Sequence, residues 1–222
     1  ISARVGHTLL FADFSQIEFR LFVHYSDSER LLQAYKDDPK VSFHRIAEAI
    51  VKPYRSDMPY TKVKSMNFLF VYGGGEAHAA EYLELPREVS DQFCRIYHQA
   101  FPEVKQLGKK AENLARTRGY VRSILGRRAR FLDPKFAYKA LNAVIQPTAA
   151  DIFKKKVVEV HAERKRTGFL MRMPVHDELV GDVPDEESAR MVNEILNRQS
   201  FPQVKVPIIW ESRTGANWAA CK

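Results

Sequence analysis

Cysteine is scarce in this 222-residue chain, whose two cysteines, Cys94 and Cys221, provide no disulfide framework. No uninterrupted apolar run reaches the roughly 18 residues of a membrane-spanning helix, and no signal peptide is visible. Internal repeats and low-complexity linkers are absent too. These absences exclude a disulfide scaffold and predict no membrane partner. They favour a reducing, intracellular setting such as cytoplasm or nucleoid.

Positive charge, in contrast, is abundant. Lys and Arg number 35 against 27 Asp and Glu, so the net charge is +8 and the isoelectric point is near 9.4. A basic surface suits a polyanionic partner such as nucleic acid, although basic proteins without such a partner are common. The length is enough for a sizeable core in one or two compact units.

Periodicity and turn residues predict an alternation of strands and helices. Helices are expected at 28–34, 42–50, 60–72, 76–83, 87–100, 104–117, 136–167 and 185–198, the seventh interrupted at Pro147. Strands are expected at 8–14, which leads into a helix through Tyr25, at 169–174 and 176–183, which would pair antiparallel across a tight turn, and at 204–211. Residues 119–132 are typical of a hairpin.

Two aspartates stand inside apolar runs that are typical of strands. Asp13 follows LLFA, and Asp177 lies within MPVHDELV. A buried carboxylate is costly unless it is paired or holds a cation. If these two meet on neighbouring strands, they could hold Mg²⁺ between them, as in two-metal phosphoryl transfer. The alternative is two unrelated aspartates at strand ends, solvated or capping turns.

One face of the predicted helix at 60–72 mixes a cation with rings. Tyr60, Lys64, Phe68 and Tyr72 follow each other at intervals of four residues, so they lie one above the other. Such a face suits a ligand with an anionic tail and a flat body, such as a nucleoside triphosphate. The alternative is an amphipathic helix whose rings pack into a core and whose lysine reaches out to solvent.

Taken in order, these segments resemble the family A (Pol I-like) DNA-dependent DNA polymerases. DFSQIEFR at 13–20 is similar to motif A of that family, Lys64 to Gly73 to motif B (K-x3-F-x3-Y-G), and VHDE at 175–178 to motif C. LNAVIQPTAADIFK at 141–154 resembles the N-x3-Q-G-T-A-A-D helix, and TGANWAACK at 214–222 resembles the end of phage-type members. The resemblance covers nearly the whole chain.

The resemblance implies an α+β fold. A palm, formed by an antiparallel sheet with packed helices, would comprise residues 1–27 and 134–222, and a mainly helical fingers subdomain would be inserted at 28–133. The thumb, the first strands of the palm and any exonuclease domain would lie upstream or in another chain.

The resemblance also implies nucleotidyl transfer. A primer 3′-hydroxyl on primer–template DNA would attack a dNTP and release pyrophosphate, with two Mg²⁺ ions, in DNA replication or repair. Asp13, Asp177 and the carbonyl of Phe14 would hold the ions, and Lys64 would assist the leaving pyrophosphate. Glu178 is a less certain ligand, because strand alternation would point it away from Asp177.

Six residues would bind the incoming nucleotide by the same resemblance: Gln16, Glu18, His44, Lys64, Phe68 and Tyr72. Glu18 would exclude a 2′-hydroxyl, Phe68 would discriminate against dideoxynucleotides, and Tyr72 would close over the templating position. The other interpretation of His44 is a partly exposed helix histidine.

DNA contacts are expected from Asn142, Gln146, His176, Arg127 and Arg128, with Arg130 in the same GRRAR segment. Asn142 and Gln146, one turn apart, would reach minor-groove acceptors that look alike in every base pair. The arginines would contact phosphate, or simply form a solvated turn. The run at 154–156, three lysines, predicts a solvated face.

Three positions depart from the family pattern. Tyr60 stands where motif B has an arginine that holds phosphate, which predicts weaker triphosphate binding or a cation supplied from elsewhere. Pro147 replaces a glycine and should kink its helix, and Tyr138 replaces a residue that is often basic. These changes suggest a divergent, viral or organellar member.

Two other functions stay open. One is a nucleic-acid-binding module that has lost catalysis, against which the intact Asp13, Asp177 and Lys64 argue. The other is an RNA-synthesising or reverse-transcribing relative. Glu18 argues against the use of ribonucleotides, but it does not indicate whether the template is DNA or RNA.

Overall fold

The computed structural model describes residues 1–74 and 76–221, and the chain divides into two compact units. The first, here the sheet unit, comprises Ile1–Leu21 and Gln146–Lys222, and the second, the helical unit, comprises Phe22–Ile145. The divisions fall inside helices α1 (Ile17–Ser26) and α8 (Asn142–Ala162), whereas the sequence placed them near the ends of predicted helices. Within the described ranges, no helix is long and apolar enough to cross a membrane.

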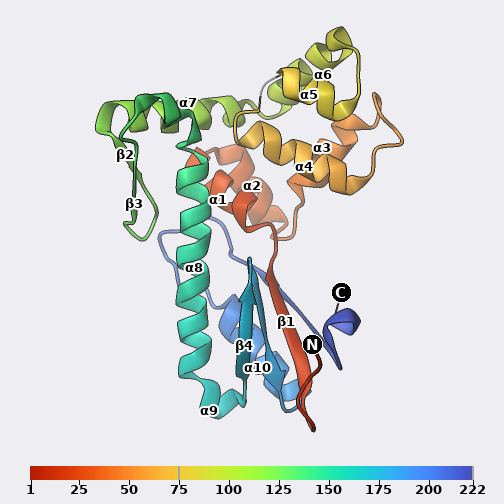
Figure 1. Cartoon of the computed structure of the whole chain (residues 1–222), viewed down its shortest axis with the longest axis vertical. Coiled ribbons are helices and arrows are strands. Elements are labelled where there is room, and N and C mark those ends of the chain that lie inside the picture. Colours follow the sequence, from red (N-terminus) through yellow and green to blue (C-terminus); the bar gives the residue numbers. More distant parts are fainter. Residues whose placement is uncertain (75, 222) are drawn as a thin grey trace. The chain divides into compact units, whose positions relative to one another are not determined.

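The sheet unit contains four antiparallel strands in the order β4-β5-β1-β6 (Figure 1). Their bounds are Thr8–Phe14 for β1, Leu170–Val175 for β4, Glu178–Val183 for β5 and Trp210–Gly215 for β6. Helix α10 (Glu186–Asn197) packs against β5 and β6 and is capped by Asp185, whose carboxylate accepts from the Ser188 N–H at 2.8 Å. Every residue of β1 from Leu9 to Phe14 is buried except Asp13. This near-continuous apolar run places β1 in the centre of the sheet.

The hairpin of β4 and β5 contains a bulge and a two-residue turn. The register shifts by one residue between Met171 and Met173, so Arg172 is the extra residue, and Val175 then pairs with Glu178. His176 and Asp177 form the turn, with a positive φ of 54° at His176. The Arg172 guanidinium donates to the buried Asp182 on β5 at 2.6 Å, which fixes the bulge.

The prediction of a strand at 204–211 was wrong in its bounds, because β6 begins only at Trp210. Val206, Ile208 and Trp210 alternate into the core as a strand would. However, the backbone here is bonded by side-chain amides: Gln199 bonds both polar groups of Ile208, and Asn197 bonds those of Trp210, at 2.9–3.2 Å. The alternation therefore predicted the buried residues correctly, but it did not predict where strand pairing begins.

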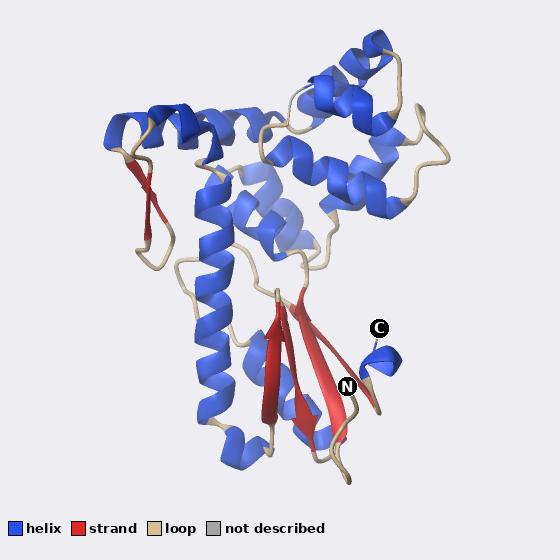
Figure 2. Ribbon diagram, in the orientation of Figure 1, coloured by secondary structure: helices blue, strands red, loops and turns tan. Residues whose placement is uncertain are grey.

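The helical unit contains most of the remaining helices and one short hairpin, and Figure 2 shows this contrast with the strand-rich sheet unit. Its elements are α2 (Glu29–Asp37), α3 (Phe43–Val51), α4 (Tyr60–Val71), α5 (Glu76–Leu83), α6 (Arg87–Ala100), α7 (Pro102–Arg118), β2 (Tyr120–Arg122), β3 (Arg128–Arg130) and a 3-10 turn, η1 (Pro134–Lys139). Ser28 and Ser42 cap α2 and α3 by accepting backbone N–H groups. Gly119, at φ 71°, ends α7 in the left-handed conformation. Buried rings of α3, α4 and α6, including Phe43, Phe70 and Tyr97, form the core.

The predicted helix at 136–167 was wrong in continuity and in the place of its break. The structure has η1, then α8 running unbroken through Pro147, then a short α9 (Arg164–Thr167). Pro147 is the sixth residue of α8, so it removes one bond, the one to the Ala143 carbonyl. Ile145, Thr148 and Ile152 are completely buried around it, and this packing keeps the helix continuous.

The lysine run at 154–156 was predicted as a solvated face, and this was wrong for Lys156. Its side chain is completely buried and donates to the carbonyls of Ile195 and Arg198, to Ser200 Oγ and to the Glu159 carboxylate, at 2.7–3.0 Å. Burial lowers the pKa of this ammonium, although Glu159 opposes the effect. Lys156 therefore ties α8 to the segment after α10.

Candidate active site

Strand β1 places Asp13 in a row of carboxylates. Asp13 pairs in register with Glu178 on β5 and with Glu211 on β6, so the three lie side by side on one face of the sheet. They line a cavity of about 280 Å³ together with Arg213. Like charges in directly opposed positions repel each other across a sheet. A bound cation would relieve that repulsion.

Asp177 lies in a different environment. It is exposed in the β4–β5 turn and lines a cleft of about 810 Å³ in the sheet unit, together with Phe14, Glu18, Gln146 and His176. The Gln146 amide lies 3.5 Å from the Glu18 carboxylate. The structure thus brings five predicted site residues into one cleft, while Asp13 lines the carboxylate cavity.

One sequence-based argument about these carboxylates was wrong. Neither Asp13 nor Asp177 is buried, so the cost of burying a charge does not indicate that either of them must hold a cation. The expectation that Glu178 points away from Asp177 agrees with the structure, because Asp177 lies in the turn and lines the cleft, whereas Glu178 begins β5 opposite Asp13 and lines the carboxylate cavity. Glu211 was missed altogether, since its proximity to Asp13 arises from long-range pairing.

The turn after β1 is held by Arg20, which sequence reasoning also left without a role. Gln16 has a positive φ of 55°, and the completely buried Arg20 donates to the Ser15 carbonyl at 2.6 Å and to the Pro207 carbonyl at 2.8 Å. The Phe14 ring packs against Trp210, with 3.9 Å between centroids. These contacts determine where α1 begins, and therefore where its second residue, Glu18, lies.

The residues present suit Mg²⁺ bound together with a substrate. Among residues 1–74 and 76–221, no group of three or more His, Cys, Asp or Glu side chains could by itself hold an ion. Mg²⁺ usually binds through one or two carboxylates and completes its shell with substrate phosphates and water. The exposed carboxylates of Asp13 and Asp177 and the Phe14 carbonyl are oxygen donors of the kind that Mg²⁺ prefers, and Asp13 pairs with Glu178, the residue that directly follows Asp177.

Helix α4 presents its predicted face outside the core of the helical unit. Lys64 is exposed and Phe68 and Tyr72 are half-buried, with their rings stacked at 6.2 Å and an interplanar angle of 8°. The buried face of α4 carries other residues: Val63, Met66, Asn67, Phe70 and Val71. The alternative in which the aromatic face packs into a core therefore does not describe this helix.

His44, on α3, lies inside a buried hydrogen-bonded chain. Its Nδ1 lies 3.0 Å from the Asn67 amide nitrogen, and the Tyr97 hydroxyl donates to the Asn67 carbonyl oxygen. Burial first, and the nearby charge of Lys64 second, lower the pKa of His44 to about 4. The ring is completely buried, unlike the partly exposed helix histidine considered above, and it lies 5.0 Å from the Phe68 ring. At neutral pH it is uncharged.

The sequence profile of DNA polymerase family A matches residues 1–220. The chain belongs to DNA polymerase family A. It is 31% identical to DNA polymerase I of Caldicellulosiruptor bescii over 98% of this chain, and 29% identical to the thermostable DNA polymerase I of Thermus aquaticus over 99%. It spans 27% and 28% of those two proteins.

A solved family A structure has the same fold. The POL domain of Pol1 from M. smegmatis, in complex with DNA primer-template and dNTP, superimposes with a TM-score of 0.84 and 26% identity. It covers 99% of this chain, which in turn covers 41% of that domain. The predictions of family and of an α+β fold with an antiparallel sheet and packed helices are confirmed.

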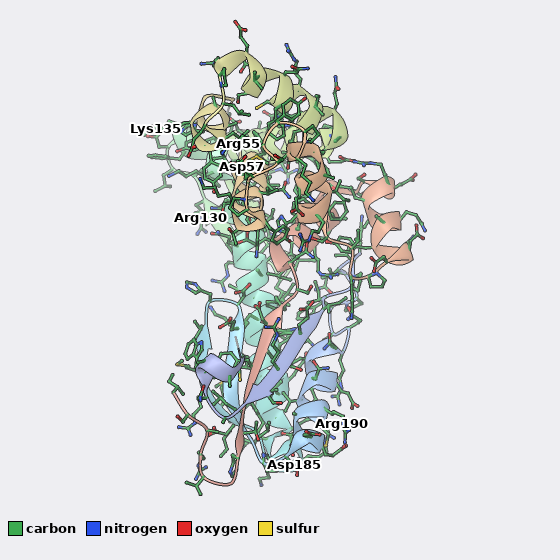
Figure 3. All side chains as sticks on the ribbon, turned by 90° about the vertical axis from the view of Figure 1, so that its right-hand side faces the viewer. Arg55, Asp57, Arg130, Lys135, Asp185 and Arg190 are labelled. Carbon is green, nitrogen blue, oxygen red and sulfur yellow. The ribbon has the colours of Figure 1, made fainter. Side chains whose placement is uncertain are left out.

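The family A chain carries its GRRAR arginines on an exposed hairpin of the helical unit. Arg127, Arg128 and Arg130 are all exposed, and Figure 3 labels Arg130. Arg122 on β2, which sequence reasoning did not single out, pairs directly with Arg128. The Arg128 guanidinium also lies 4.9 Å from the centre of the Tyr120 ring. Opposed like charges of this kind favour an anionic partner.

Two further positions bear on the comparison with the family pattern. Asn142 is the first residue of α8 and is half-buried, one turn before Gln146. Tyr60, where family A has arginine, lies at the start of α4, and the guanidinium of Arg45 on α3 stands 4.1 Å above its ring.

Proposed function

We propose that this family A chain takes part in template-directed DNA synthesis, in replication or repair. A nucleotide would pass from dNTP to a primer 3′-hydroxyl and pyrophosphate would be released. The observation that carries this proposal is the cleft of the sheet unit, where Glu18, Gln146, His176 and Asp177 line one space of about 810 Å³.

The two units would supply different parts of the chemistry. The sheet unit would be the palm, with the carboxylates, and the helical unit the fingers, with the cation and rings of α4. Thumb and exonuclease regions would belong to another part of the protein or to another chain.

Asp13, Asp177 and the Phe14 carbonyl would hold two Mg²⁺ ions. When bound, the ions lower the pKa of the 3′-hydroxyl and neutralise charge on the triphosphate. Lys64 would neutralise the charge that develops on the leaving pyrophosphate and could donate a proton to it. Catalysis would consist mainly of positioning and electrostatic stabilisation.

Selection of the nucleotide would depend on Glu18. Its carboxylate is held close to the Gln146 amide, at 3.5 Å, on a helix whose start is fixed by Arg20. In that position it would collide with a 2′-hydroxyl, so deoxyribonucleotides would be preferred. Gln16 would border the sugar, and the stacked rings of Phe68 and Tyr72 would pack on the sugar and base.

His44 would act as a neutral group beside Lys64, because burial keeps its pKa near 4. It would support one face of α4, here called the nucleotide face, which is formed by Tyr60, Lys64, Phe68 and Tyr72. The support would pass through Asn67 and Phe68. A direct hydrogen bond to the triphosphate would require that the buried ring become accessible when nucleotide binds.

Contacts with DNA would come from the start of α8, from the β4–β5 turn and from the β2–β3 hairpin. Gln146 and Asn142 would face minor-groove acceptors, and His176 would touch the primer terminus. The arginines at 122, 127, 128 and 130 would contact backbone phosphates, which position the duplex without reading its sequence.

Primer extension tests the proposal. The full chain is incubated with primer–template DNA, Mg²⁺ and dNTPs, beside Asp177→Ala and beside Glu194→Ala, which removes an exposed carboxylate on α10 in the same unit. We expect extension that Asp177→Ala abolishes and Glu194→Ala retains. DNA binding without extension would contradict it and favour a binding module. Parallel reactions with rNTPs and with an RNA template would detect an RNA-synthesising or reverse-transcribing enzyme.

A further inference from the structure

The nucleotide face of α4 carries a single lysine for a ligand with several negative charges. Lys64 lies one turn after Tyr60, and the two residues that follow on this face, Phe68 and Tyr72, are uncharged. Lys62 is two residues from Lys64, so it projects from another side of the helix, where its ammonium lies 3.6 Å from Glu84. A second cation for the triphosphate must therefore come from outside α4.

Arg45 stands where such a cation is needed. Its guanidinium lies 4.1 Å from the centre of the Tyr60 ring, within the range of a cation–π interaction. Because Tyr60 and Lys64 are neighbours on the helix surface, this contact brings the guanidinium to the lysine end of the nucleotide face. The ring of the adjacent His44 lies 5.0 Å from the Phe68 ring, so the first turn of α3 lies along the same face of α4 that carries Lys64.

The guanidinium is held and yet accessible. Its side chain is 63% exposed, and Glu48 on the same helix accepts from Nη1 at 2.8 Å. A guanidinium has five N–H donors in a planar fork that matches phosphate oxygens, so one carboxylate contact leaves capacity for a phosphate. Stacking on a ring and pairing with Glu48 restrict the rotamers of a long side chain before any ligand binds.

We propose that Arg45 binds the triphosphate of the incoming nucleotide beside Lys64, and that the Tyr60 ring positions it there. This inference rests on the proposed function. Tyr60, which is itself uncharged, thus positions a cation from the neighbouring helix α3, the guanidinium of Arg45, where the family pattern has an arginine on α4.

Equilibrium binding of dTTP and dTMP in the presence of Mg²⁺ tests the inference without chemistry. Charge-assisted phosphate contacts are strong, and we expect Arg45→Ala to weaken dTTP binding about tenfold. We expect it to change dTMP binding less than about twofold, because dTMP lacks the outer phosphates. The matched control is Arg87→Ala, since Arg87 is 68% exposed and pairs with Asp91 one turn away on α6.

Variants of the ring test the positioning role. Tyr60→Phe keeps the ring and should bind dTTP as the wild type does, whereas Tyr60→Leu should lose about threefold. In a Tyr60→Arg background, Arg45→Ala should cost less than it does in the wild type, because the introduced arginine meets the same phosphates.

The outcomes separate the two proposals. If wild type binds dTTP and Lys64→Ala weakens it, but Arg45→Ala behaves like Arg87→Ala, the inference is overturned and the proposed function stands. Equal losses for dTTP and dTMP would also overturn it, since they would indicate a general disturbance of the fold. If wild type binds no dTTP, the proposed nucleotide site on α4 is contradicted, and the inference about Arg45 is overturned with it.

Discussion

Acidification from pH 7 to pH 5 should destabilise this protein through His44. The folded state holds this histidine uncharged, with a pKa of about 4, against an ordinary value of 6.5. As the pH falls below 6.5, the unfolded chain takes up a proton that the folded chain refuses. The stability contributed by the neutral ring is therefore complete above pH 6.5, and it is lost progressively down to pH 4.

The size of the effect follows from the two pKa values. Each pH unit of separation corresponds to about 1.4 kcal/mol, so the full loss is about 3 kcal/mol, of which about 2 kcal/mol has occurred by pH 5. This is a large fraction of the stability of a typical domain. The cause is local: His44 is completely buried against Asn67, and Lys64 adds a positive charge nearby.

Urea unfolding at pH 7 and pH 5 measures it. Wild type should lose about 2 kcal/mol more between these pH values than His44→Gln, whatever the stability of the variant at pH 7. His98, whose pKa burial also lowers to about 4, acts in the same direction, so both proteins are compared again in a His98→Gln background. His161→Gln removes an exposed histidine and serves as the control. Equal losses in wild type and His44→Gln would refute the reasoning.

Three further changes have defined outcomes. Arg20→Lys should lower the free energy of unfolding by about 2 kcal/mol, since an ammonium cannot reach both the Ser15 and Pro207 carbonyls. A change below about 0.5 kcal/mol in urea unfolding would contradict this expectation. Lys156→Met should lower the free energy of unfolding by about 3 kcal/mol in the same assay, because Glu159 loses its buried partner. Unchanged stability would show that the buried ammonium does not stabilise the fold. Glu18→Ala should raise ribonucleotide incorporation relative to deoxyribonucleotide about tenfold; an unaltered ratio in primer extension would remove Glu18 as the steric gate.

Local signals in the sequence predicted the local structure well. Ser28, Ser42 and Asp185 mark helix starts that the structure confirms, and α5 and α6 have the predicted bounds. The period of four residues along α4 also separated the face with Lys64, Phe68 and Tyr72 from the face that packs into the core. Such features depend on residues a few positions apart, which a sequence shows directly.

The site was less predictable wherever it depends on distant residues. The pairing of Asp13 with Glu211 joins positions 198 residues apart, and the side-chain amides of Gln199 and Asn197 bond the backbone of Ile208 and Trp210. The chain from Tyr97 through Asn67 to His44 joins three helices. Nothing in the spacing of these residues indicates that they meet, and Pro147 shows that packing can also override a strong local signal.

Because of the bulge in β4, the number of residues in this strand determines where Asp177 lies. Arg172 adds one residue between the two registers of the β4–β5 ladder, and only the second register closes over a two-residue turn with Asp177 in it. Leu170 and Met171 are exposed, so their identities are weakly constrained by packing. A single deletion or insertion between Leu170 and His176 would nevertheless move the carboxylate of Asp177 to another position and face. The side chains of Leu170 and Met171 can therefore vary, whereas the number of residues in the strand cannot.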